Sequence, residues 1–153
     1  MNKYDKMLEL NKKKSEEKVT SAVNTIREMV VEKEKVSIPK LMKKTGLSRG
    51  FFYKNPIVTD IVVPSGITSV EKQAFYGCPA LESVEIYGVE WIGAAAFREC
   101  AALKKADIGK TETLCDEAFM NCGALEEVQT KDALKSVGAR AFYGCGKIKS
   151  GVL

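Results

Sequence analysis

The side chains that could do chemistry in this chain are five cysteines and a set of carboxylates, because its 153 residues include no histidine. The lack of imidazole excludes His-based catalytic triads and Cys/His zinc fingers. Four cysteines lie 22 or 23 residues apart, a spacing unlike the C-x-x-C pairs of metal sites: Cys78, Cys100, Cys122 and Cys145. We therefore expect buried, reduced thiols with no bound metal, and expect Cys115, outside this series, to be the most exposed.

A second set of polar residues recurs at the same period in three strand-like segments. Glu85, Asp107 and Gln129 take equivalent positions there, and neighbouring strands would place them about 5 Å apart. Two carboxylates at that spacing fit a cation or an acid–base pair, but a solvated strand face explains them equally well. No glycine-rich phosphate loop follows a strand, and no serine or cysteine has a plausible base. We expect no catalysis and no cofactor, and assign the three residues to a protein-interaction surface.

These residues belong to a segment that occurs four times. Each copy contains Ala-Phe-x-x-Cys-x-x-Leu, or Ile in the last copy, and the phenylalanines are Phe75, Phe97, Phe119 and Phe142. An aliphatic residue stands five positions before each of them: Val70, Ile92, Leu114 and Val137. A fixed period between 20 and 29 residues with such anchors predicts a leucine-rich solenoid of about four coils. Solenoids of this kind form binding faces rather than catalytic pockets.

The repeats resemble the BspA-type leucine-rich repeat family, whose units read roughly A-F-x-x-C-x-x-L-x-x-V-x-I-P-x-x-V-x-x-I-G. Residues 63–70 and 86–93 match the second half of that unit, and the resemblance covers about residues 57–153. It implies the solenoid fold, but names no partner, because the family shares a scaffold that binds different things in different proteins.

Trp91 is a further candidate for partner binding. It stands beside Ile92 in a strand-like run whose neighbours alternate inward, so its ring should point outward. An exposed tryptophan is typical of the residues that dominate binding energy at protein interfaces. Burial against an adjacent coil is the alternative.

Charge divides the chain into two parts. Residues 1–56 contain 14 Lys and Arg against 7 Asp and Glu, whereas residues 57–153 contain 10 against 13. A basic head on an acidic body indicates two modules with different partners, and the head favours a polyanion. We therefore predict an α+β chain with an all-α head over residues 1–56 and the solenoid over residues 57–153.

The head has the pattern of a helix-turn-helix. Residues 3–35 contain no glycine or proline, and an apolar stripe over residues 19–30 predicts helix, either as one helix or as two divided at Ser15. A second helix should begin after Ser37 as N-cap and stop at Gly46. Ser48 should cap a third helix, which Asn55-Pro56 ends.

The run Gly-Leu-Ser-Arg-Gly-Phe-Phe-Tyr-Lys-Asn-Pro, residues 46–56, resembles small accessory proteins encoded beside recombinases in site-specific transposons. Its Gly-x-Ser-x-Gly-x-x-Tyr spacing is also similar to that around the reading helix of TetR-type repressors. The resemblance implies binding to double-stranded DNA through Lys43, Lys44, Ser48, Arg49 and Lys54. This chain departs from the accessory family after residue 56, where a second charged helix is replaced by the start of the solenoid.

The sequence thus favours a non-enzymatic, transposon-derived DNA-binding adaptor whose solenoid binds a protein. The alternative is a scaffold whose helices only cap the repeats. No segment is apolar enough for a membrane span or a signal peptide, so we expect a cytoplasmic location and no membrane partner. The sequence stops within a strand-like run at residues 151–153, which predicts a homodimer through the C-terminal coil.

Overall fold

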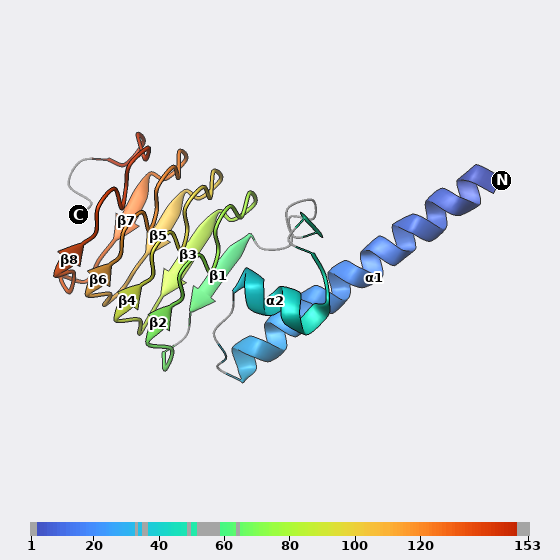
Figure 1. The fold of residues 1–153 in the computed structure, drawn as a ribbon, viewed down its shortest axis with the longest axis horizontal. Coiled ribbons are helices and arrows are strands. Elements are labelled where there is room, and N and C mark those ends of the chain that lie inside the picture. Colours follow the sequence, from blue (N-terminus) through green and yellow to red (C-terminus); the bar gives the residue numbers. More distant parts are fainter. Residues whose placement is uncertain are drawn as a thin grey trace.

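The computed structural model describes residues 3–32, 34, 37–48, 50–51, 59–63 and 65–149. Within them, two helices precede a stack of strands that alternate between two sheets (Figure 1). The elements are α1 (Lys3–Val31), α2 (Ile38–Thr45), β1 (Asp60–Val63), β2 (Ser69–Val70), β3 (Ser83–Ile86), β4 (Trp91–Ile92), β5 (Lys105–Asp107), β6 (Thr113–Leu114), β7 (Glu127–Gln129) and β8 (Ser136–Val137). The predicted α+β fold, with helices followed by a solenoid of about four coils, is confirmed.

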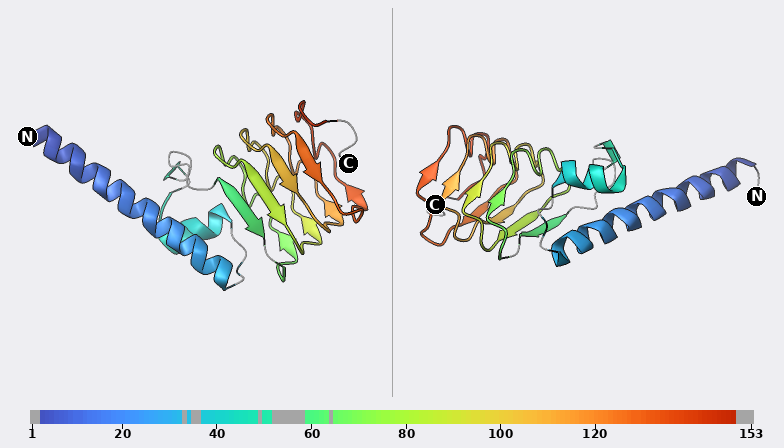
Figure 2. Two further views of the ribbon diagram at one scale, coloured as in Figure 1. Left: turned by 180° about the vertical axis from the view of Figure 1, so that it is seen from behind. Right: turned by 60° about the horizontal axis from the view of Figure 1, so that its bottom comes forward.

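The two sheets run along the whole stack, and every strand pair is parallel. Strand order is β1-β3-β5-β7 in one sheet and β2-β4-β6-β8 in the other, so each coil adds one strand to each sheet. Residues one repeat apart are therefore direct neighbours, as in the row Val84, Ala106 and Val128. Figure 2 shows the coils stacked as near copies of one another.

A column of phenylalanine rings fills the centre of this stack. Phe75, Phe97 and Phe119 are fully buried, and their ring centroids lie 5.3 and 5.0 Å apart. Phe142 continues the column at 5.5 Å from Phe119. Each buried ring stabilises its repeat together with the aliphatic side chains buried in the same coil.

Backbone hydrogen bonds next to the phenylalanine rings join neighbouring coils. The N–H groups of Phe75, Phe97 and Phe119 each donate to the alanine carbonyl before the next phenylalanine, with N···O distances of 2.8 Å in all three cases. The residue two before each phenylalanine adopts a left-handed conformation: Gln73, Ala95, Glu117 and Arg140 have φ of 55°, 54°, 59° and 57°. None of the four is glycine, and residues with a side chain disfavour this conformation. The hydrogen bonds between coils and the packing of the rings must therefore offset its energetic cost.

Exposed ion pairs also link neighbouring coils. Four residues at one repeat position alternate in sign, namely Glu82, Lys104, Glu126 and Lys149. Lys104 Nζ lies 2.9 Å from Glu82 Oε2, and Lys149 Nζ lies 3.6 Å from Glu126 Oε2. Because these side chains are exposed, each pair stabilises the fold only slightly.

The helix α1 is continuous from Lys3 to Val31, which decides the open question at Ser15 in favour of one helix that ends short of residue 35. Ala22 and Met29 are fully buried where α1 meets Ile38 and Leu41 of α2. The described side chains over residues 5–18 are all exposed, and this half of α1 projects away from the solenoid (Figure 1).

Both predicted ends of α2 are confirmed. Ser37 has extended backbone, and its Oγ accepts a hydrogen bond from the Lys40 N–H at 3.3 Å. Gly46 takes a left-handed conformation with φ of 71°, and its N–H donates to the Met42 carbonyl at 2.9 Å. These are the caps that serine and glycine favour.

The start of α2 docks on the first coil of the solenoid. The Ile38 N–H donates to the Ala74 carbonyl at 2.8 Å, and Ala74 is the counterpart of the alanines that accept from phenylalanine N–H groups in later coils. Residues of both helices and of all four coils share one apolar core. The helix therefore covers the front of the solenoid in the place of a preceding coil, as terminal repeats require.

Gly109 gives a test of the coil spacing. It has φ of 52°, and a methyl group there would overlap the Ile86 carbonyl oxygen of the preceding coil. We expect Gly109→Ala to lower the free energy of unfolding by about 2–4 kcal/mol, because backbone cannot yield as a side chain can. Gly123→Ala is the matched control, since a methyl there meets no atom within 4 Å. Equal urea-denaturation midpoints for the two variants would contradict the close packing of coils.

Candidate functional site

The exposed side of the sheet β1-β3-β5-β7 carries polar and charged side chains. We call its central part the open face; it comprises Ser83, Glu85, Lys105, Asp107, Glu127 and Gln129, which line a shallow hollow of about 260 Å³. Glu85 pairs in register with Asp107, and Asp107 with Gln129. The predicted row of these three residues is therefore confirmed, although their role in binding stays a prediction.

The open face carries negative charge that the fold neutralises only in part. Lys105 Nζ lies 3.3 Å from Glu127 Oε2. Glu85 instead accepts the Tyr87 hydroxyl at 2.5 Å, which raises the pKa of Tyr87, and Asp107 Oδ1 accepts the Gly109 N–H at 2.9 Å. No ion pair found among the described residues includes Glu85 or Asp107. Two adjacent carboxylates thus remain available to a cationic group.

Trp91 lies on the other sheet. Its side chain is 40% exposed, as the strand alternation predicted. It belongs to β4 and pairs with Ser69 of β2 and Thr113 of β6. The structure therefore separates Trp91 from Glu85, Asp107 and Gln129, and the four predicted interaction residues do not form one surface.

The repeat-position cysteines form a buried column with hydrogen bonds that the sequence did not reveal. The Sγ atoms of Cys100 and Cys122 each donate at 3.1 Å to the carbonyl of the phenylalanine one coil back, and Cys145 does so at 3.0 Å. Contact with the Cys78 thiol, together with burial, raises the pKa of Cys100, and contact with Cys145 and burial raise that of Cys122. These two thiols therefore stay protonated at neutral pH and are poor nucleophiles.

The five cysteines are all free, and Cys115 alone is not buried. Its greater exposure matches the prediction. Among the described residues, no group of three or more Cys, Asp or Glu side chains could hold a metal ion. No helix of the described residues is long and apolar enough to cross a membrane.

In the head, the structure describes three of the five predicted DNA-binding residues. Lys43 is exposed near the end of α2, and Ser48 follows the Gly46 turn. Ser48 Oγ accepts the Phe51 N–H at 3.2 Å, as expected of a helix cap. Arg49 and Lys54 lie outside the described residues.

Lys44 has a partner that sequence reasoning missed. Its Nζ lies 2.8 Å from Glu34 Oε1, and this hydrogen bond raises the pKa of Lys44 and lowers that of Glu34. Glu34 lies ten residues before Lys44, beyond the reach of helical periodicity, so only the turn between α1 and α2 brings them together. Part of the charge expected to meet phosphate is already balanced within the protein.

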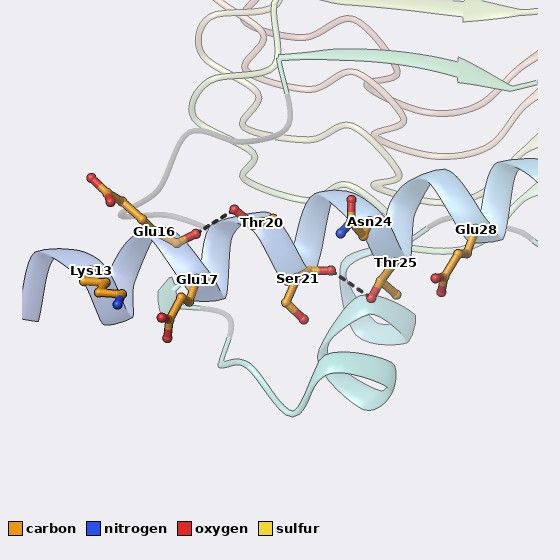
Figure 3. A pocket seen from close by; sticks show the side chains of 8 residues that line it. All are labelled: Lys13, Glu16, Glu17, Thr20, Ser21, Asn24, Thr25 and Glu28. Carbon is orange, nitrogen blue, oxygen red and sulfur yellow. Dashed lines mark hydrogen bonds between the residues drawn. The ribbon is translucent and has the colours of Figure 1, made fainter.

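A second hollow, of about 610 Å³, follows the polar side of α1. Figure 3 shows its eight labelled residues, Lys13, Glu16, Glu17, Thr20, Ser21, Asn24, Thr25 and Glu28, in line along the helix. The Thr20 and Thr25 hydroxyls donate to carbonyls one turn earlier, at 2.9 and 3.0 Å. Both hydroxyls are thus engaged in hydrogen bonds within α1, and the charged residues that line the hollow include both lysine and glutamate. We therefore assign no binding or catalytic role to this hollow.

The cysteine column yields a stability prediction. Cys122→Ala removes the buried sulfur atom together with its hydrogen bond to the Phe97 carbonyl. It should therefore lower the free energy of unfolding by about 1–3 kcal/mol. Cys115→Ala, at a half-buried position, should change it by less than about 0.5 kcal/mol. Thermal denaturation with and without reductant measures both, and reductant should leave the wild-type midpoint unchanged. A midpoint that falls on reduction would contradict free thiols.

Comparison with known proteins places the two parts of the chain separately. The family model described as "BspA type Leucine rich repeat region (6 copies)" matches residues 45–153, and "Family of unknown function (DUF6262)" matches residues 3–73. The two matches overlap over residues 45–73. No curated protein matches the chain.

Two solved structures are similar to the solenoid. A leucine-rich repeat protein from Bacteroides ovatus is 30% identical with a TM-score of 0.57, over 64% of this chain and 26% of its own length. A leucine-rich repeat protein from T. pallidum is 24% identical with a TM-score of 0.41, over 67% of this chain and 64% of its own. The chain thus spans about a quarter of the Bacteroides protein. With its repeats, stacked coils and family match over most of its length, the chain belongs to the BspA-type leucine-rich repeat family.

Proposed function

We propose that this chain is a non-enzymatic interaction protein that binds a protein partner through the open face. The observation that supports this most is the pair Glu85 and Asp107, which line the hollow side by side without a cationic partner among the described residues. An in-register row of this kind on a rigid sheet holds its charges in fixed positions, which lowers the entropy cost of binding.

The charge of the open face selects the chemistry of the partner. Lysine or arginine side chains on the partner would pair with the two carboxylates, while Gln129 offers an amide that can donate and accept hydrogen bonds. A surface with this pattern favours a basic segment over an acidic or apolar one. Trp91 on the other sheet would belong to a separate contact.

The proposal assigns the head a capping role, supported by the Ile38–Ala74 hydrogen bond and by the shared core. Free cysteines are typical of proteins in a reducing compartment, which supports the proposal of a cytoplasmic location.

A transposon-derived DNA-binding adaptor is the second candidate. The Ser48–Phe51 hydrogen bond after the left-handed Gly46 supports it, because this is how the reading helix of a helix-turn-helix begins. Lys43 is exposed and would lie near phosphate together with Arg49 and Lys54. The pairing of Lys44 with Glu34 reduces the charge that remains for such contacts.

The open face can be tested with a tetralysine peptide as a generic basic probe. We expect Glu85→Gln with Asp107→Asn to weaken binding about tenfold, because two charge-assisted contacts of the hollow are lost. The control is Glu112→Gln with Asp132→Asn, which removes the same charge outside the open face. Calorimetric titration of both variants measures the effect. Equal weakening would mean that only net charge matters and would count against the open face.

The second candidate can be tested by titrating a DNA duplex at two salt concentrations. A reading head should lose affinity with a log–log slope of about −0.9 for each phosphate contact. Arg49→Ala with Lys54→Ala should lower that slope, whereas Lys147→Ala with Lys149→Ala in the last coil should not. Absence of binding at low salt would leave the head with its capping role alone.

A further inference from the structure

The cysteine column ends at Cys145, in the last coil that the structure describes. This residue is 9% exposed, whereas the other three cysteines of the column are exposed by 4% or less. Exposed Gly144 and Gly146 flank Cys145 in the chain, so neither sequence neighbour has a side chain that could shield the thiol. A small solute can therefore reach this thiol more readily than the rest of the column.

One backbone oxygen holds Cys145 against Cys122 of the coil before it. The Phe119 carbonyl accepts both the Cys145 thiol, at 3.0 Å, and the Cys122 N–H, at 3.2 Å. The two thiols are also in contact with each other. Between these two coils the stacked rings of Phe119 and Phe142 lie 5.5 Å apart. A coil spacing of this size falls within the range of about 4.4–6.8 Å that a disulfide allows between its Cα atoms.

The contact between the two thiols makes them chemically unequal. The hydrogen bond with Cys122 lowers the pKa of Cys145, whereas the contact with Cys145 and burial raise the pKa of Cys122. Cys145 therefore carries the larger share of thiolate, which is the form of cysteine that reacts with oxidants. Cys122 stays protonated beside it.

We propose that Cys145 is a peroxide-reactive thiol and that Cys122 captures its oxidised form as a disulfide between the last two described coils. In the first step, the Cys145 thiolate attacks the terminal oxygen of a hydroperoxide. An S–O bond forms and the O–O bond breaks, and the alkoxide or hydroxide that leaves takes a proton to become an alcohol or water. The sulfur gives two electrons to the peroxide and becomes a sulfenic acid.

In the second step, the Cys122 sulfur attacks Cys145 Sγ. The S–S bond forms while the S–O bond breaks, and the departing hydroxide takes the Cys122 proton and leaves as water. The sulfenic acid lacks the thiolate charge that raises the pKa of Cys122, so Cys122 releases its proton more easily at this stage. A thiol reductant reverses the modification by exchange with the disulfide.

The backbone around the pair tolerates the loss of both thiol protons. Before oxidation, Cys122 donates to the Phe97 carbonyl and Cys145 donates to the Phe119 carbonyl. Each of these oxygens also accepts a backbone N–H at 3.2 Å, from Cys100 and from Cys122 respectively. Neither buried acceptor is therefore left without a donor when the disulfide forms.

Cys78 and Cys100 provide a comparison within the same protein. The Phe75 carbonyl accepts the Cys100 thiol at 3.1 Å and the Cys78 N–H at 3.3 Å, which is the arrangement found at Cys122 and Cys145. Contact with Cys78 and burial raise the pKa of Cys100, and both residues are less exposed than Cys145. The two pairs share their geometry but differ in exposure and acidity, so they should differ in their rate of reaction with peroxide.

Hydrogen peroxide is the probe, and the full chain with Cys115→Ala is the reference, because this change removes the half-buried thiol outside the column. Two of its four remaining thiols should be lost on oxidation and restored by dithiothreitol. After alkylation and tryptic digestion, mass spectrometry should find peptides 111–131 and 141–147 joined, since they contain Cys122 and Cys145. Cys145 should react at least about tenfold faster than Cys78.

Two further changes in that reference chain separate the roles of the thiols. Cys122→Ala should leave Cys145 as a sulfenic acid that dimedone labels, with no joined peptides. Cys100→Ala removes an equally buried thiol of the column and should still form the disulfide, which controls for lost packing. Equal oxidation of Cys78 and Cys145, a Cys78–Cys100 disulfide that forms as fast, or loss of the joined peptides in Cys100→Ala would overturn the proposal.

Discussion

The structure depends on one repeated contact between coils, in which a phenylalanine N–H donates to an alanine carbonyl while the phenylalanine rings stack beside it. The ring spacing of about 5 Å is also the separation of neighbouring strands, so apolar packing and the backbone ladder set the same distance. Other positions adapt to it. Left-handed backbone at Glu117 and the lack of a side chain at Gly109 both follow from this spacing.

A ladder of this kind has ends whose backbone groups need partners. At the front of the solenoid, a helix supplies the missing partner. The first N–H groups of a helix have no acceptor within the helix and point along its axis, so they can donate to a neighbouring carbonyl. Ile38 can therefore donate to Ala74 without losing a bond inside α2. The head differs from the repeats in its basic composition, and one apolar core is shared between them.

Periodicity predicted the solenoid, the phenylalanine column and the outward row from Glu85 to Gln129, because each consists of residues that recur at the same position of every repeat. Local rules were enough for the caps at Ser37 and Gly46. Contacts set by the meeting of different elements could not be predicted in this way: the Lys44–Glu34 pair, the thiol bonds to phenylalanine carbonyls and the docking of Ile38. Trp91 shows the same limit, since alternation predicted its exposure but could not show that it lies on the other sheet from Glu85.

The alternating charges of Glu82, Lys104, Glu126 and Lys149 bear on how nearly identical coils find their order during folding. A chain that skipped one coil would still match phenylalanine to phenylalanine, so the apolar core discriminates poorly against such an error. The skip would bring Glu82 beside Glu126, or Lys104 beside Lys149, and replace attraction by repulsion. Weak pairs that add little to the finished fold can therefore disfavour a misordered one, and their value lies in the fidelity of assembly.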